Sequence, residues 1–127
     1  MGTMGPGAFD SDSAGDLVSQ AESMLRKPIN KVISLKSFAA ASYHYDAARA
    51  ASMMLLVISQ ESHSISEESI EGAITALDRM RNDKVWMSSW KTPASAKKAI
   101  DGDIGRLGFE LDHIRKERLR ILRAFSK

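Results

Sequence analysis

The 127-residue sequence predicts an all-α protein, an antiparallel helical bundle of three long helices plus a shorter N-terminal helix. Two observations carry this prediction. A long apolar stripe at helical spacing fills residues 92–127, and the segments upstream show the same spacing of apolar residues. The expected connections are short, which makes sequential helices antiparallel neighbours. The size and balance of the chain, with 43% hydrophobic and 27% charged residues, indicate one domain at 14–127 after a flexible arm at 1–13.

The C-terminal helix is the element around which the prediction is built. Its start is marked by Thr92 as an N-cap and Pro93 at the first helical position, where a missing N–H costs nothing. If unbroken to Arg123, it is about 46 Å long at about 1.5 Å per residue. Leu107 stands at the centre of its stripe, whose members are Ala96, Ile100, Ile104, Leu107, Leu111, Ile114, Ile121, Leu122 and Phe125. Such a helix buries its stripe only against other long helices.

The chain begins with a Gly-, Ser- and Asp-rich arm at 1–13 that has no periodicity. A short amphipathic helix is expected at 14–27, with Asp16 in its first turn where the helix dipole favours a negative charge. Pro28 should end or kink this helix, because proline lacks the N–H that continues the hydrogen-bond ladder.

The second helix is predicted at 29–60 and should be the central helix of the core. Its middle is rich in alanine, which lets a neighbouring helix come close. Its end, Met53 to Ile58, is apolar on every side of a helix. That pattern indicates burial all round or burial against a second subunit.

The third helix is predicted at 66–90, starting at Ser66 as the N-cap with a hydrophobic staple between Ile65 and Ile70. If this helix is regular, Trp86 and Trp90 lie opposite its apolar face. The alternative is that the helix breaks near Asn82 and Asp83 and both rings cap the core of the monomer.

Three glycines, Gly102, Gly105 and Gly108, interrupt the C-terminal helix and would together cost about 2 to 3 kcal/mol relative to alanine. One reading breaks the helix there. The other, which we favour because the stripe keeps its phase, continues the helix and lets the glycines beside Phe109 admit a close neighbour.

Several chemistries are not expected from this sequence. No cysteine is present, which excludes disulfides, thiolate nucleophiles and cysteine-based metal sites. Glu110 and His113 form a single E-x-x-H step, whereas a di-iron bundle needs two, so we expect a solvated flank. The Asp101 to Asp112 segment resembles the opening of a calcium loop, but it has Arg106 where that loop needs a glycine and Asp112 where it needs a bidentate glutamate. Without a phosphate loop or nucleophile elbow, we expect neither an enzyme nor a cofactor.

The sequence also bears on whether the chain spans a membrane and in which compartment it is found. The longest apolar run has six residues, far fewer than the roughly 20 that span a bilayer. No secretory signal is readable at the N-terminus. We therefore expect no membrane span. The absence of cysteine fits a cytoplasmic protein, and export by a non-classical route is the alternative.

The net charge is +2, and the basic excess lies in residues 92–127, which carry nine basic and five acidic groups. Its candidate basic surface consists of Arg115, Lys116, Arg120 and Arg123. A basic helix could contact phosphates, although interleaved acids and the helix dipole favour a solvated face. Arg118 differs, because its spacing puts it inside the apolar stripe, where a charge needs a partner or a wet interface.

The leading functional hypothesis is a non-catalytic interaction module, either a homodimer or a small adaptor or regulator. Its main support is surplus apolar surface together with the absence of catalytic motifs, and the candidate interface residues are Trp86, Trp90, Met53, Met54 and Phe109. The partner is then a second copy or another protein. The alternatives are a nucleic-acid-associated regulator that uses the basic helix and a metal-dependent bundle enzyme centred on Glu110 and His113.

Overall fold

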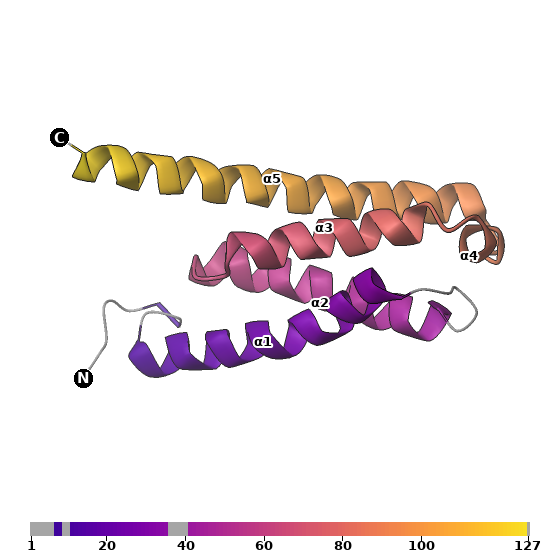
Figure 1. The fold of residues 1–127 in the computed structure, drawn as a ribbon, viewed down its shortest axis with the longest axis horizontal. Coiled ribbons are helices and arrows are strands. Elements are labelled where there is room, and N and C mark those ends of the chain that lie inside the picture. The colour runs from indigo at the N-terminus through magenta and orange to yellow at the C-terminus, as the bar shows by residue number, and fades with distance from the viewer. Residues whose placement is uncertain (1–6, 9–10, 36–40, 127) are drawn as a thin grey trace.

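The computed structural model describes residues 7–8, 11–35 and 41–126. Within these ranges the chain forms five helices and no β-strand, which confirms the all-α class. The helices are α1 (Asp12–Ser34), α2 (Ala41–Ser62), α3 (Glu67–Arg81), α4 (Lys84–Ser88) and α5 (Pro93–Phe125). In Figure 1 the four longer helices lie side by side along the long axis of the molecule, and α4 forms a short turn at one end.

The packing centres on α3, which contacts α1, α2 and α5, while α1 also packs closely on α2. By contrast, α5 lies mainly on α3 and touches α2 at fewer places. The predicted order of helix lengths is wrong, because α1 has 23 residues and α3 has only 15. The third helix is therefore much shorter than α5, which has 33 residues and is more than twice as long as the helix that supports it.

The first helix starts earlier and ends later than predicted. Ser11 caps it by accepting a hydrogen bond from the Ala14 N–H, so Asp12 and Ser13 belong to the helix and not to a flexible arm. Residues 1–6 and 9–10 of that arm lie outside the described residues. Pro28 does not end α1, because the next turn buries Ile29 and Val32 in the core and burial outweighs one lost hydrogen bond.

Residues 29–34 therefore continue α1, and the prediction that they open the second helix is wrong. The Arg79 guanidinium of α3 closes this end of α1 by donating to the carbonyl oxygens of Ile33 (2.9 Å) and Leu35. Residues 36–40, which were also assigned to the second helix, lie outside the described residues.

The second helix buries one face, not its whole circumference. Tyr45, Ala48 and Leu55 are fully buried, as expected for a helix at the centre of the core. Met54 and Val57 are 54% and 58% exposed, so the expectation of all-round burial within the chain is wrong for the run from Met53 to Ile58. The isolated chain leaves this part of α2 open to water.

The start of α3 matches its sequence signals. The Ser66 hydroxyl accepts from the Ser69 N–H, and Ile65 and Ile70 are both buried beside it. Glu22 of α1 ties this turn to the first helix by accepting from the backbone N–H of Ser66 (3.0 Å) and the hydroxyl of Ser69 (2.5 Å). Burial alone raises the pKa of Glu22, but the hydrogen bonds from Ser69 and Ser66 outweigh it, and the pKa is lowered overall.

The predicted helix at 66–90 is interrupted at Asn82 and Asp83, so the regular-helix alternative is wrong. Asn82 ends α3, and the Asp83 carboxylate caps α4 by accepting from the Trp86 N–H at 3.0 Å. This break turns Trp86 inward, where it is only 8% exposed and meets the Tyr45 ring at 5.0 Å edge to face. Trp90 packs on Trp86 at a ring-centroid distance of 5.6 Å and stays 38% exposed.

The last helix is continuous through its three glycines, as favoured above. Thr92 precedes it and Pro93 opens it, but the Thr92 side chain makes no capping hydrogen bond. Apart from the nearby backbone of α5 itself, no described heavy atom lies within 4 Å of a Cβ placed on Gly102, Gly105 or Gly108, so among the described residues the glycines admit no close neighbour. Leu107 is fully buried, which confirms the phase of the stripe. Across the described ranges, no helix is both long and apolar enough to cross a membrane.

Candidate interaction surface at the end of α5

The last turns of α5 extend beyond the rest of the molecule. Figure 1 shows its yellow end projecting past the nearby ends of α2 and α3. We call residues 118–125 the α5 extension, and every one of them is exposed. Its large apolar side chains are Leu119 (48% exposed), Ile121 (47%), Leu122 (57%) and Phe125 (84%). The apolar stripe of α5, which includes the buried Leu107, thus continues in Ile121, Leu122 and Phe125 beyond the end of α3.

A groove with a volume of about 690 Å³ adjoins the extension, where α5 passes the α2–α3 turn. Its apolar lining is Ile65, Ile114, Ile121 and Leu122. Its polar lining is Glu67, Glu68, Glu110, Glu117, His63, His113 and Arg118. Four apolar side chains, four carboxylates, two imidazoles and one guanidinium group therefore line the groove together.

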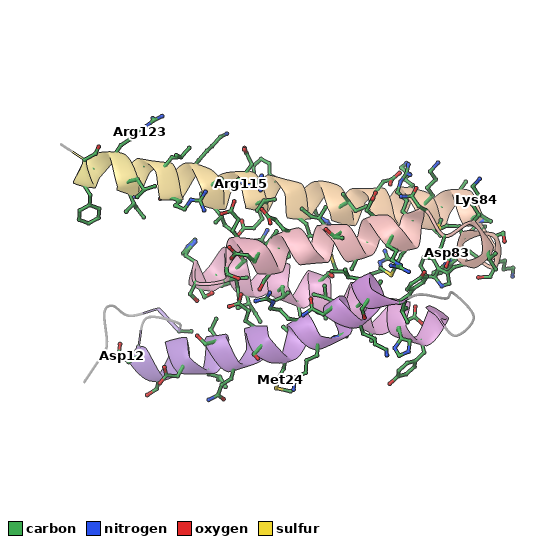
Figure 2. The ribbon with its side chains drawn as sticks, viewed as in Figure 1. Asp12, Met24, Asp83, Lys84, Arg115 and Arg123 are labelled. Carbon is green, nitrogen blue, oxygen red and sulfur yellow. The ribbon has the colours of Figure 1, made fainter. Side chains whose placement is uncertain are left out.

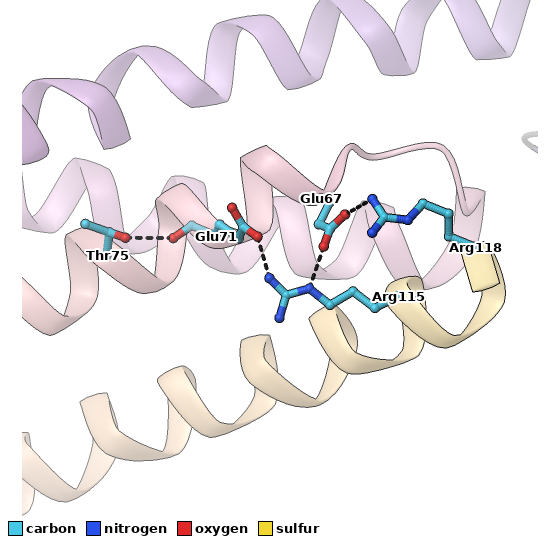
Figure 3. A network of polar contacts seen from close by, with 5 residues as sticks. All are labelled: Glu67, Glu71, Thr75, Arg115 and Arg118. Atoms are coloured by element: carbon cyan, nitrogen blue, oxygen red, sulfur yellow. Dashed lines mark hydrogen bonds and ion pairs between the residues drawn. The ribbon is translucent and has the colours of Figure 1, made fainter.

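One side of the groove is fixed by an ion-pair network between α3 and α5 (Figure 3). The Glu67 carboxylate accepts from Arg115 and from Arg118, each at 2.5 Å, and Arg115 also donates to Glu71 at 2.5 Å. The hydrogen bond from Arg115, assisted by the charge of Arg118, lowers the pKa of Glu67 although desolvation opposes it. Arg118 thus has the partner that its position in the stripe requires.

The four residues of the candidate basic surface are exposed, as predicted for a solvated face. Most of them form ion pairs with acidic residues of the same chain. Besides the Arg115 network, Lys116 contacts Asp112 at 2.9 Å and Arg120 contacts Glu117 at 3.0 Å. The pKa of Glu117 is lowered by the hydrogen bond from Arg120 and by its charge. Arg123 forms no ion pair within the part of the chain that the structure describes, and Figure 2 shows it pointing away from the other helices.

The expectation of a solvated flank is wrong for Glu110, which is 7% exposed and accepts a hydrogen bond from the Ser59 hydroxyl of α2. His113 is exposed, as that expectation requires. A second buried carboxylate, Asp103, accepts from Arg49 of α2 at 2.8 Å and from Arg106. Both carboxylates join α5 to α2.

No group of three or more histidine, aspartate or glutamate side chains that could hold a metal ion occurs among the described residues. The buried polar cluster near α4 also has a structural explanation. Tyr45 donates to Asp83 at 2.8 Å, and burial, helped by this hydrogen bond, raises the pKa of the Tyr45 phenol. A phenol held protonated beside a helix cap stabilises the turn between α3 and α4.

The residues singled out as a candidate interface do not share one environment. Trp86 belongs to the core of this chain, and Met53 is half-buried against that core. Met54 is exposed on α2, and Phe109 is 80% exposed on α5. Trp90 lies between these extremes beside Trp86.

The groove itself was missed by sequence reasoning, because it depends on where α3 begins relative to α5. One signal was available: Ser66 starts the third helix, while the stripe of the last helix runs on to Phe125. If the break at Asn82 is placed correctly, α3 is about 22 Å long and α5 about 50 Å long at about 1.5 Å per residue. That mismatch predicts an unsupported helix end.

Comparisons with protein-family models, curated proteins and solved structures give no match to this chain. Its function therefore has to be sought in the chemistry of its own surface.

Proposed function

We propose that this chain is an antiparallel helical bundle that acts as a non-catalytic interaction module and associates with itself through the end of α5. The observation that carries the proposal is the α5 extension, a helix end on which the stripe residues Ile121, Leu122 and Phe125 are 47%, 57% and 84% exposed. A lone small domain gains nothing from holding such a surface in water, and apolar patches of this kind mark interaction sites.

The chemistry of the groove supports binding more than catalysis. Its lining of apolar and charged side chains together is typical of protein interfaces, which combine the two. Two of its carboxylates are engaged within the chain: Glu67 binds two arginines, and Glu110 binds Ser59. Groups held this way stabilise the walls of the groove.

The test is the association state in solution. Sedimentation of the wild type over a range of concentrations should show reversible self-association, and Leu122→Gln should raise the dissociation constant by roughly tenfold or more. The matched control is Leu17→Gln on α1, because Leu17 is 66% exposed and lies away from the groove. A wild type that remains a monomer throughout would overturn self-association.

Nucleic acid binding is the competing outcome of the same study. Phosphate contacts would have to compete with the carboxylates that already pair with Arg115, Lys116 and Arg120. Binding to mixed duplex DNA or RNA that falls steeply with salt and is lost in Arg123→Glu would favour the nucleic-acid-associated regulator instead.

A further inference from the structure

We infer that the groove beside α5 receives the α5 extension of a second copy of this chain, in a two-fold antiparallel pairing that places Phe125 against Ile114 of the other copy. This inference rests on the proposed self-association and names the surface that performs it. The extension forms part of the groove through Arg118, Ile121 and Leu122, so a single two-fold contact fills both grooves and covers both extensions.

The apolar surfaces match in kind. Phe125 is 84% exposed, and Ile121 and Leu122 line the groove while remaining about half exposed. Ile65 and Ile114 line the same groove. Ile114, Ile121 and Phe125 are seven and four residues apart, so they share one face of the helix. An antiparallel second extension lays its own copy of this face against Ile65 and Ile114.

The direction of the pairing follows from the positions of these residues. In a parallel pairing Phe125 would meet Phe125, and neither ring would reach Ile114, so both grooves would stay empty. In the antiparallel pairing the two-fold axis passes between residues 119 and 120, halfway from Ile114 to Phe125. The two Phe125 positions are then separated along the helices by about 16 Å, which is 11 residues at about 1.5 Å each.

Part of the charge also matches. The extension carries three arginines and no acidic residue, and two of these arginines already pair with groove glutamates of their own chain. Arg123 of the extension and Glu68 of the groove form no ion pair within the described residues. The second copy therefore supplies a guanidinium group and a carboxylate that can pair across the contact. Association of this kind weakens as salt screens the attraction between the two surfaces.

The experiment uses the absence of cysteine from the sequence, since any introduced thiol is the only one in the chain. Ser126→Cys places a thiol at the end of the extension and leaves Phe125 in place. Ser64→Cys places one in the α2–α3 turn, between the groove residues His63 and Ile65. The control, Ser88→Cys, lies in α4 at the opposite end of the molecule.

Equal amounts of two variants are mixed and treated with a short bis-maleimide reagent. The expected result is a cross-linked dimer from Ser126→Cys with Ser64→Cys, and only background from Ser126→Cys with Ser88→Cys or from Ser126→Cys alone. Independently, Phe125→Ala should raise the dissociation constant roughly 100-fold, as expected when both copies lose a central aromatic anchor. Tyr43→Ala, at a residue 78% exposed on α2, should leave the dissociation constant unchanged.

Two outcomes overturn the inference while leaving the proposed function intact. If the wild type associates but Ser126→Cys cross-links efficiently with itself and not with Ser64→Cys, the pairing is parallel. If the wild type associates and Phe125→Ala has no effect, the second copy binds elsewhere. A wild type that stays monomeric removes the proposed self-association as well, so the two failures are distinguishable.

Discussion

The two halves of α5 share the same spacing of apolar residues but differ in how far those residues are buried. In residues 93–111 the apolar positions Ala96, Ile100 and Leu107 are buried against α3. From residue 112 onward no described residue of α5 is fully buried, although Ile114, Ile121 and Phe125 continue the stripe. The periodicity of a helix thus specifies which face is apolar, and the length of its neighbour decides whether that face is buried.

Charged residues show the same contrast between the two halves. In the packed half, Asp103 and Glu110 are buried and accept hydrogen bonds from α2. In the distal half, Lys116 and Arg120 are exposed and pair with acids on the same helix, three or four residues away. Buried carboxylates hold helices together at fixed places, whereas exposed ion pairs of this kind contribute little to folding.

The largest expected effect compares one leucine from each half. Leu107→Ala should lower the free energy of unfolding by about 2 to 5 kcal/mol, because a fully buried leucine leaves a cavity in a packed core. Leu122→Ala should cost about 0.5 kcal/mol or less when measured on the monomer, since that side chain is 57% exposed. Urea denaturation of the two variants at low protein concentration measures both. Equal losses would show that the distal half is packed as well.

The next effect tests the buried carboxylate of the packed half. Ser59→Ala removes the hydroxyl that donates to Glu110 and leaves a buried acceptor without that partner, at an expected loss of about 1 to 3 kcal/mol. Ser52→Ala is the matched control, because Ser52 is equally buried on α2 but donates only to the Ala48 carbonyl of its own helix. Its loss should be smaller. If Ser59→Ala is harmless in the same denaturation assay, Glu110 does not depend on Ser59.

A smaller effect with the opposite sign concerns the open back of α5. Gly105→Ala should raise the free energy of unfolding by about 0.5 to 1 kcal/mol, because alanine favours the helix and nothing lies within 4 Å of the added Cβ. Thermal denaturation monitored by far-ultraviolet circular dichroism measures this gain. A loss of stability would mean that another chain packs closely on the glycines.

The features that sequence reasoning predicted correctly depend on local signals. The start at Ser66, the continuous helix from Pro93 and the burial of Leu107 each follow from a cap, a proline position or a period. The errors arise where tertiary contacts decide. Burial of Ile29 and Val32 carries α1 through Pro28, and capping by Asp83 re-phases the chain so that Trp86 meets Tyr45.

Local sequence signals do not predict the groove, because its shape depends on where the ends of different helices lie relative to one another. Glu110 illustrates the difficulty. Its position at the edge of the apolar stripe predicted a solvent-exposed side chain. Instead Glu110 is buried, and the hydrogen bond from Ser59 of α2 offsets part of the cost of removing its carboxylate from water. Ser59 stands one residue before the predicted end of the second helix, and nothing local marked it as the partner of a carboxylate 51 residues later.

The smallest expected effect examines the junction between the two halves, where Glu67 binds Arg115 and Arg118. The pKa of Glu67 is lowered in the folded chain, so its ionised form stabilises the fold at pH values above the pKa of an unfolded glutamate, about 4.3. This contribution is lost as the pH falls through the lowered pKa of the folded state. Glu67→Gln should therefore reduce the melting temperature slightly near pH 7, by less than Gly105→Ala raises it.

In the same variant the difference from wild type should shrink below about pH 4, where the wild-type carboxylate also becomes protonated, and in about 1 M salt, which screens exposed ion pairs. Glu61→Gln is the control, because Glu61 is exposed at the end of α2 and forms no ion pair among the described residues. A Glu67→Gln effect that is independent of both pH and salt would mean that the junction is held by packing. The ion pairs would then contribute no stability at the point where α5 leaves the core. Packing of Ile65 and Ile114 would set the shape of the groove without them.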